Sequence, residues 1–294
     1  DFSIQRTIQR QLEIYETILR RHHRPRKKRD GVVICGAYGR GNAGDEAILE
    51  AILLELRAID PDLPLWVMTR KPMDTRLRHR VNAVYTFHVP SFARRMAHSQ
   101  LYINGGGSLM QDVTSRRSLW FYLYTLDAAK RRGCKVMMYG CGIGPVLREE
   151  HRRLASNVLN ACVDVITLRE PDSLKELQSM GVTKPEILLT ADPALTLPAA
   201  GADEIDSVLL RAGIPPHGKY LCFALRNWKG FADKAPLFGQ AAKYAYETYG
   251  LTPVFTAVEK HLDPGAGRLA AAGLDIPHYF LDDAGSAGTI IGAL

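Results

Sequence analysis

The chain has 294 residues, of which 46% are hydrophobic and 23% are charged. This composition is typical of a globular protein and excludes a long disordered chain, while the length indicates two domains or one large one. No apolar run reaches the roughly 18–20 residues that cross a bilayer. Five Cys without a CxxC pair exclude a disulfide scaffold and a zinc ribbon. We therefore expect a cytoplasmic protein and leave open a peripheral contact with the inner face of the membrane.

The net charge of +7 is concentrated in the first part of the sequence. Residues 1–30 carry nine Lys or Arg and four Asp or Glu, a net +5, so the other 264 residues carry only +2. Two interpretations of the basic run at 22–30 stay open. We favour a solvated linker over a surface for nucleic acid or anionic lipid.

The predicted elements begin with an amphipathic helix at residues 2–21, capped by Ser3 and ended before Pro25. From residue 31 strands and helices alternate, which predicts a mainly parallel sheet with helices on both faces. Strands are expected at 32–35, 63–70, 99–104, 134–139, 163–170 and 186–195, and helices at about 45–59, 118–133, 151–162 and 172–181.

A linker with a short helix is expected at 198–217, followed by a second alternation. This has a strand at 219–226, a helix near 235–249 and a strand at 252–258, and then stops early. The sequence therefore predicts one complete α/β domain and part of another. Because 288–294 looks like the start of an element, we expect the sequence to belong to a longer polypeptide.

The loop at Gly36–Ala47 follows a buried strand and opens a helix, which suits binding of an anion by backbone N–H groups. The spacing does not match a dinucleotide fingerprint, and two carboxylates at the start of the helix would repel a pyrophosphate. For Asp45 two roles stay open, helix cap or acid/base catalyst at an acceptor hydroxyl. Glu46 is interpreted as a complement to the helix dipole.

Two further glycine segments follow predicted strands. The three glycines and the serine at 105–108 exceed what a tight turn needs, so we favour a backbone nest for a phosphate or carboxylate. The segment 140–144 repeats this design. Open α/β sheets bind ligands at the carboxyl ends of their strands, so we expect these loops to meet at one site.

Charged residues end several other predicted strands. Arg169 suits either an anionic substrate or a salt bridge to an acid next to it, and Asp192 either orients a cation or caps a turn. In the second domain, Arg226 and Lys229 suit a compact polyanion, the alternative being a solvated loop. The nine His show no metal-ligand spacing.

Six segments occur in order: GAYGRGNAGDEAIL, INGGGSLMQDVTSRRSLWFYL, YGCGIGP, VITLREPDSLKEL, TADPAL and LRNWKG. Together they resemble the polysaccharide pyruvyl transferase family, especially its bacterial cell-wall members, over roughly residues 31–294. The resemblance implies two Rossmann-like domains in a glycosyltransferase-B-like arrangement, the second incomplete, with the site in the cleft. The domains are expected at 31–198 and 199–294.

The resemblance implies transfer of pyruvate from phosphoenolpyruvate to two hydroxyls of one sugar as a cyclic ketal. The expected acceptor is a lipid-linked saccharide containing N-acetylmannosamine, a precursor of the secondary cell wall polysaccharide that anchors surface-layer proteins. Phosphoenolpyruvate is the co-substrate, and no cofactor, metal ion or nucleic acid is expected. Asp45 is the expected catalytic residue, and the expected substrate-binding residues are Tyr38, Gly39, Gly41, Asn42, Gly44, Gly105, Gly106, Gly107, Ser108, Arg169, Asp192, Arg226 and Lys229.

Two features depart from the family pattern. Residues 1–24 resemble the last helix of a two-Rossmann-domain glycosyltransferase, so 1–30 are expected to be the tail of a fused or neighbouring transferase. Deleting 1–29 is then expected to leave the melting temperature of the remainder nearly unchanged. The family's later Arg-Leu-His segment is absent from these residues, so the general acid is expected beyond Leu294. A nucleotide-sugar glycosyltransferase and a non-catalytic α/β binding module stay open as alternatives.

Overall fold

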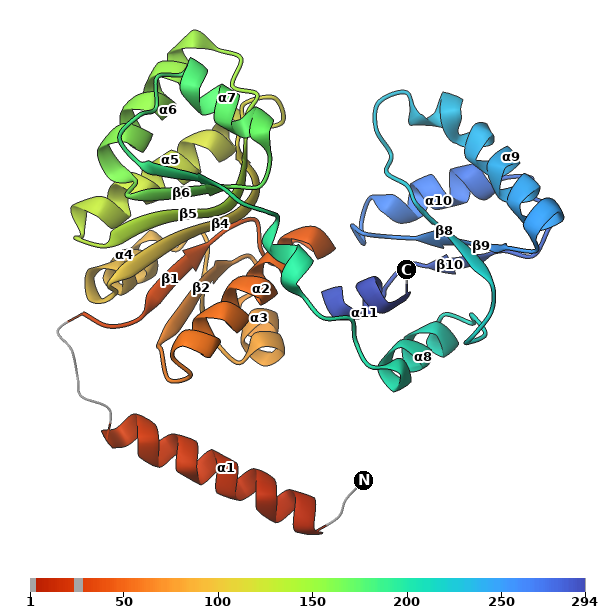
Figure 1. The fold of residues 1–294 in the computed structure, drawn as a ribbon, viewed down its shortest axis with the longest axis horizontal. Helices are drawn as coiled ribbons and strands as arrows, with labels where there is room; N and C mark the ends of the chain where they lie inside the picture. The colour runs from red at the N-terminus through yellow and green to blue at the C-terminus, as the bar shows by residue number, and fades with distance from the viewer. Residues whose placement is uncertain (1–3, 24–28, 294) are drawn as a thin grey trace.

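The computed structural model describes residues 4–23 and 29–293 and contains two parallel β-sheets with helices packed on them (Figure 1). The larger sheet has seven strands in the order β3-β2-β1-β4-β5-β6-β7, and all neighbouring strands run parallel. Its strands are β1 Val32–Cys35, β2 Leu65–Thr69, β3 Asn82–Tyr85, β4 Leu101–Met110, β5 Lys135–Ile143, β6 Val165–Leu168 and β7 Glu186–Leu189.

Helices cover both faces of this sheet, because successive side chains of a strand point to opposite sides. In β1, Val33 and Cys35 belong to one buried hydrophobic cluster and Val32 and Ile34 to another. The first cluster includes side chains of α4, α5, α6 and α7, and the second includes side chains of α2. The helices of this domain are α2 Ala43–Ile59, α3 Pro72–His79, α4 Val89–His98, α5 Arg116–Arg131, α6 Glu149–Cys162 and α7 Pro171–Ser179.

The smaller sheet has three parallel strands in the order β10-β9-β8. One aromatic ring from each strand stacks on the next, with centroid distances of 5.3 Å between Phe223 and Phe255 and 5.6 Å between Phe255 and Phe280. The elements of this part are α8 Ala202–Arg211, β8 Tyr220–Ala224, α9 Phe231–Tyr249, β9 Thr252–Thr256, α10 Asp263–Ala271, β10 Tyr279–Leu281 and α11 Ala287–Ala293.

The two domains meet through small side chains and backbone hydrogen bonds. The chain crosses between them at the 3₁₀ helix η1 Pro193–Thr196, and α11 packs on α2. A small buried cluster joins Ala47 and Ala51 of α2 to Leu197 and to Ala287 of α11. In addition, the loop before α2 pairs with the loop after β9: the Ala43 amide donates to the Val258 carbonyl at 2.9 Å, and the Lys260 amide to the Gly41 carbonyl at 3.2 Å.

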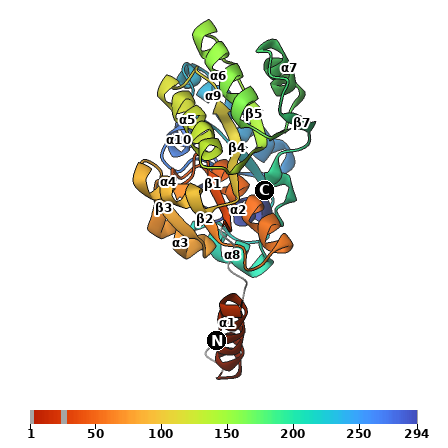
Figure 2. The ribbon, with the colours of Figure 1, turned by 90° about the vertical axis from the view of Figure 1, so that its left-hand side faces the viewer.

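The first helix, α1 Ile4–His23, projects away from both domains in two perpendicular views (Figures 1 and 2). Six apolar residues on it are at least half exposed, and Arg20 pairs with Asp62 of the first domain. The predicted helix at 2–21 is therefore confirmed, while its cap Ser3 and most of the basic run lie outside the described residues. No helix in the described ranges combines the length and the apolar character that a bilayer crossing requires. The six apolar residues are Ile8, Leu12, Ile14, Tyr15, Ile18 and Leu19.

Arg29 belongs structurally to the first domain rather than to a solvated linker. Its guanidinium donates hydrogen bonds to the carbonyl oxygens of Met96 and Ser99 at 2.8–3.0 Å, and also to that of Arg132. These bonds tie the chain just before β1 to the ends of α4 and α5. We therefore expect Arg29, unlike the residues before it, to contribute to the stability of the first domain.

The predicted α/β class with two Rossmann-like domains is confirmed, but the sequence pattern missed several elements. It left out α3, β3 and α4, because α3 is largely polar and β3 is a four-residue edge strand with a mixed burial pattern. The second alternation does not stop at residue 258 but continues through α10, β10 and α11. Ala, Gly and short apolar runs weaken the hydrophobic pattern there.

Candidate functional site

In the larger sheet β1 and β4 are neighbours, and the strand that follows each lies on its far side: β2 beside β1, and β5 beside β4. The boundary between β1 and β4 is therefore a topological switch point. Ligands of open α/β sheets bind outside the carboxyl ends of strands at such a point. The loop after β1 leads into α2 here, and the glycine segment of β4 lies beside it. The sequence prediction of one shared site for these two segments is consistent with this arrangement.

At the start of α2, the residue that caps the helix differs from the residue whose carboxylate has no partner among the described residues. The Asn42 side chain accepts hydrogen bonds from the Gly44 amide at 2.9 Å and the Asp45 amide at 3.2 Å, so Asn42 is the N-cap. Glu46 accepts a hydrogen bond from the Gly39 amide at 2.7 Å and thereby closes the loop. The alternative in which Asp45 caps the helix is wrong, and Asn42 and Gly44 serve the cap through these bonds.

The Asp45 carboxylate forms no hydrogen bond or salt bridge with any described residue. It lies against the glycine segment, because a Cβ added to Gly107 would be 3.0 Å from its Oδ1. Burial raises the pKa of Asp45 to about 6, and the charge of Glu46 adds to this. The cations Arg40, Arg169 and Arg226 act in the opposite direction. A carboxylate with this pKa can exchange a proton near neutral pH.

The glycines at 105–107 lie inside β4 and do not follow it, which corrects the predicted nest after the strand. Gly105 and Gly107 pair with Tyr139 and Cys141 of β5. Gly106 and Gly107 have φ of +62° and +71°, and a Cβ on Gly106 would come within 2.2 Å of Ile48 Cγ2. These glycines let α2 approach the sheet closely, which brings Asp45 to β4.

Tyr38 joins the two glycine segments. It is buried, and its hydroxyl donates a hydrogen bond to the Gly105 carbonyl at 2.9 Å. Its ring also lines a pocket described below. Gly39 and Gly41 instead line a second pocket of about 270 Å³ between the domains, together with Lys260 and His261.

Arg169 lies in a polar cluster at the end of β6. It donates to Asp192 at 2.6 Å and to the Ser108 hydroxyl at 3.3 Å, and Glu170 lies 3.8 Å away. Asp192 also caps η1 by accepting from the Ala194 amide at 3.0 Å. Asp192 therefore has both roles that the sequence left open: it orients a cation and it caps a turn.

In the second domain, Arg226 is held by carboxylates after β8. Its Nε donates to Asp263 at 3.2 Å, and Glu259 lies 3.9 Å from its Nη2. Asp263 is buried and also accepts from the Val258 and Glu259 amides at 3.1 and 2.6 Å. Lys229 is exposed. Arg226 is therefore held in a fixed position by these carboxylates.

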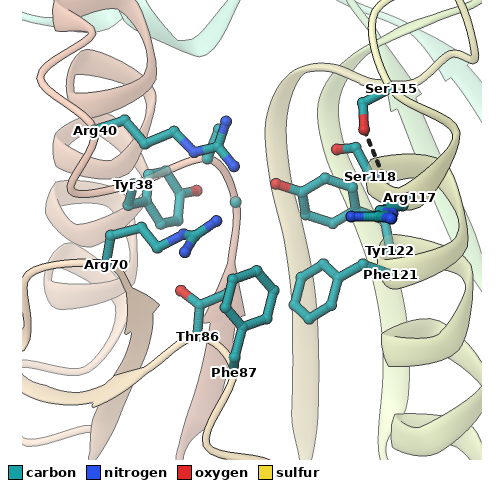
Figure 3. A pocket seen from close by; sticks show the side chains of 12 residues that line it. Tyr38, Arg40, Arg70, Thr86, Phe87, Ser115, Arg117, Ser118, Phe121 and Tyr122 are labelled. Atoms are coloured by element: carbon teal, nitrogen blue, oxygen red, sulfur yellow. Dashed lines mark hydrogen bonds between the residues drawn. The ribbon is translucent and has the colours of Figure 1, made fainter.

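A pocket of about 410 Å³ lies on the other side of Tyr38, between α5 and the loops after β1, β2 and β3 (Figure 3). We call it the triple-arginine pocket, after Arg40, Arg70 and Arg117. None of the three was singled out from the sequence, although Arg40 lies within the first glycine loop and Arg70 directly follows β2. The remaining lining residues include Thr86, Phe87, Ser115, Ser118, Phe121 and Tyr122.

The described residues contain no group of three or more His, Cys, Asp or Glu placed to hold a metal ion. The groups available for chemistry at this site are the Asp45 carboxylate, which has no partner among the described residues, and the side chains of several arginines. These groups suit an anionic substrate and proton transfer at a hydroxyl.

Solved structures share this fold at low sequence identity. Anabaena HepE in complex with UDP-glucose aligns with a TM-score of 0.54 at 10% identity, covering 85% of this chain and 68% of that one. A glycosyltransferase from Rickettsia africae has a TM-score of 0.54 at 11% identity, covering 90% and 71%. UDP-GlcNAc 2-epimerase from Neisseria meningitidis, bound to UDP-GlcNAc, has a TM-score of 0.51 at 12% identity, covering 88% and 74%.

The curated proteins contain no match to this sequence. The profile of the polysaccharide pyruvyl transferases, in contrast, matches residues 42–284, which span both domains from the start of α2 to the turn before α11. The chain belongs to the polysaccharide pyruvyl transferase family.

Proposed function

We propose that this chain binds phosphoenolpyruvate and transfers its pyruvate as a cyclic ketal to a sugar of a cell-wall polysaccharide precursor. The acceptor we propose is a lipid-linked saccharide carrying N-acetylmannosamine, met at the inner face of the membrane beside the glycosyltransferase that builds it. The observation that carries this proposal is Asp45, a carboxylate without a hydrogen-bond partner among the described residues, at the switch point of the first domain. Family membership supports the reaction class.

The donor has two anionic ends, a phosphate and a carboxylate. Arg169 of the first domain and Arg226 of the second both influence Asp45 electrostatically, so both lie near it. Their carboxylate partners fix their side chains, and each guanidinium keeps donors for a ligand. The proposed donor site lies between them, with exposed Lys229 at its edge.

Asp45 serves as the base in this proposal. A general acid protonates the methylene carbon of phosphoenolpyruvate, and the adjacent carbon becomes electron-poor. An acceptor hydroxyl attacks that carbon and gives its proton to Asp45. Cleavage of the bond to the phosphate oxygen releases inorganic phosphate, and attack by the second hydroxyl, with loss of its proton, closes the ketal.

Calorimetric titration with phosphoenolpyruvate and, in parallel, with UDP-glucose tests the donor. We expect binding of phosphoenolpyruvate, weakened about tenfold or more by Arg169→Ala or Arg226→Ala, because a charge-assisted hydrogen bond contributes ~1.5–3 kcal/mol. Arg268→Ala is the matched control, since Arg268 pairs with Asp282 on the second domain. Heat with UDP-glucose alone would exclude the pyruvyl transferase and favour the nucleotide-sugar glycosyltransferase. Heat with neither ligand would favour a binding module.

A further inference from the structure

The triple-arginine pocket concentrates positive charge, and none of the residues that line it is acidic. Arg169 and Arg226 each form a salt bridge, but Arg40, Arg70 and Arg117 form none with any described residue. Arg70 is positioned by neutral groups, with its guanidinium 4.1 Å from the centroid of the Phe87 ring and its Nη1 3.3 Å from the Tyr85 hydroxyl. Three guanidinium groups without acids in one concavity are suited to a polyanion.

The arginines converge from two sides. Figure 3 shows Arg40 and Arg70 extending toward the opening from the β1 and β2 side, with Arg117 on the opposite side, on α5. Arg117 lies in the first turn of α5, where the helix dipole adds positive potential. A group bound between them would contact both sides of the pocket.

The rest of the pocket wall is aromatic and hydroxylated. Phe87 and Phe121 meet edge to face at 5.2 Å, next to Tyr122. Thr86, Ser115 and Ser118 supply hydroxyl groups, and the volume of about 410 Å³ is within the range of small-ligand sites. Aromatic faces pack against the apolar face of a ring while hydroxyls bond to its polar edge. An inorganic anion alone would not contact this aromatic and hydroxylated wall.

The pocket also adjoins the candidate base. Tyr38 lines it and bonds to Gly105, two residues before Gly107, against which Asp45 lies. Burial raises the pKa of both Tyr38 and Tyr122, and the charge of Asp45 adds to both shifts. A ligand that fills the pocket therefore has one end near Asp45.

We infer that the triple-arginine pocket binds the phosphate or diphosphate of a glycosyl phosphate, with Arg40, Arg70 and Arg117 as its ligands and the sugar ring against the aromatic wall. The identification of this ligand as the acceptor rests on the proposed function. Its consequence is that the acceptor is recognised as an anion, at a site separate from that of the donor. A neutral oligosaccharide would leave three cations unpaired.

Titration calorimetry with inorganic pyrophosphate and with a sugar 1-phosphate, each with and without saturating phosphoenolpyruvate, tests the inference. We expect both probes to bind in the presence of phosphoenolpyruvate, and the sugar 1-phosphate to bind more tightly than inorganic phosphate. Arg117→Ala and Arg70→Ala should each weaken pyrophosphate about tenfold or more. Arg117→Lys should recover part of the loss, because it keeps the charge but not the planar fork.

Arg116→Ala is the matched control, since Arg116 is exposed on the same helical turn and does not line the pocket. Equal effects of Arg116→Ala and Arg117→Ala would overturn the inference, and so would displacement of pyrophosphate by phosphoenolpyruvate in a one-to-one competition. If phosphoenolpyruvate fails to bind while pyrophosphate still depends on Arg117, the donor proposal falls and the phosphate site stands. Melting temperatures of all variants identify any that fail to fold.

Discussion

Asp45 is the residue on which the proposed chemistry depends, and the structure separates its role from that of its neighbours. Asn42 caps α2, Glu46 closes the loop on Gly39, and Asp45 has neither duty. Asp45→Asn is therefore expected to lower turnover on the order of 10²–10⁴-fold while leaving the affinity for phosphoenolpyruvate nearly unchanged.

The pH profile of the same reaction gives an independent check. Because the pKa of Asp45 is about 6, kcat/KM should rise with pH up to about 6 and level off above it. The Asn variant should lack this limb, and Glu55→Gln, an exposed acid on the same helix, should retain it. Unchanged turnover in Asp45→Asn would assign Asp45 a scaffold role.

Asp45 also predicts how stability depends on pH. Folding raises its pKa from the ordinary value of 3.8 to about 6, so the folded state binds more protons between these values. Below about pH 4 this carboxyl group is protonated in both states and does not lower the free energy of unfolding. As pH rises through 6 it must ionise while buried, which lowers the free energy of unfolding by at most about 3 kcal/mol. Asp45→Asn should then raise the melting temperature at pH 8 and leave it nearly unchanged at pH 4. An equal shift at both pH values, or a loss, would contradict this assignment.

At the scale of elements, we expect residues 1–28 and Arg29 to contribute differently to the stability of the first domain. The apolar face of α1 is exposed, and an isolated helix of about 20 residues is only marginally stable in water. Deleting 1–28 is therefore expected to leave the melting temperature of the remainder nearly unchanged. Deleting 1–29 removes the bonds from Arg29 to three carbonyl groups and should cost roughly 2–3 kcal/mol.

Differential scanning calorimetry of the two truncated chains, with Arg29→Ala in the full chain as a third sample, measures the contrast. A large loss already in the 1–28 deletion would show that α1 is integral to this domain. Equal stability of both truncated chains would show that the Arg29 bonds contribute little.

At the scale of the whole molecule, the two domains are coupled through a small apolar contact. Ala287 of α11 is buried against Ala47 and Ala51 of α2, so Ala287→Glu places an unpaired charge there. We expect the domains to separate and phosphoenolpyruvate affinity to fall at least tenfold, because Arg169 and Arg226 come from different domains. Ile291→Glu, on the exposed part of the same helix, is the control.

Small-angle X-ray scattering and calorimetry on both variants check this coupling. The radius of gyration should increase for Ala287→Glu alone, while unfolding of the seven-stranded domain should stay close to that of the unaltered chain. Retained affinity in a chain whose domains have separated would mean that one domain binds the donor by itself.

The sequence by itself determined the α/β class, the amphipathic α1, the two glycine segments near Asp45, and all strands except β3 and β10. These features depend on local pattern: runs of buried apolar residues, helical spacing and glycine before a helix start. The polar α3 and the short edge strand β3 carry no such pattern, so the sequence did not show them.

Only the tertiary structure decided which charged groups meet. Arg40, Arg70 and Arg117 are separated by 30 and 47 positions along the chain, yet they line one pocket because parallel strands end at the same edge and α5 returns across it. The sequence left the partners of Arg169 and Arg226 open, and folding pairs each with a carboxylate distant in the chain, Asp192 and Asp263. Hydrogen-bond partners and burial follow from contacts between distant segments, and these contacts distinguish the capping Asn42 from the unpaired Asp45.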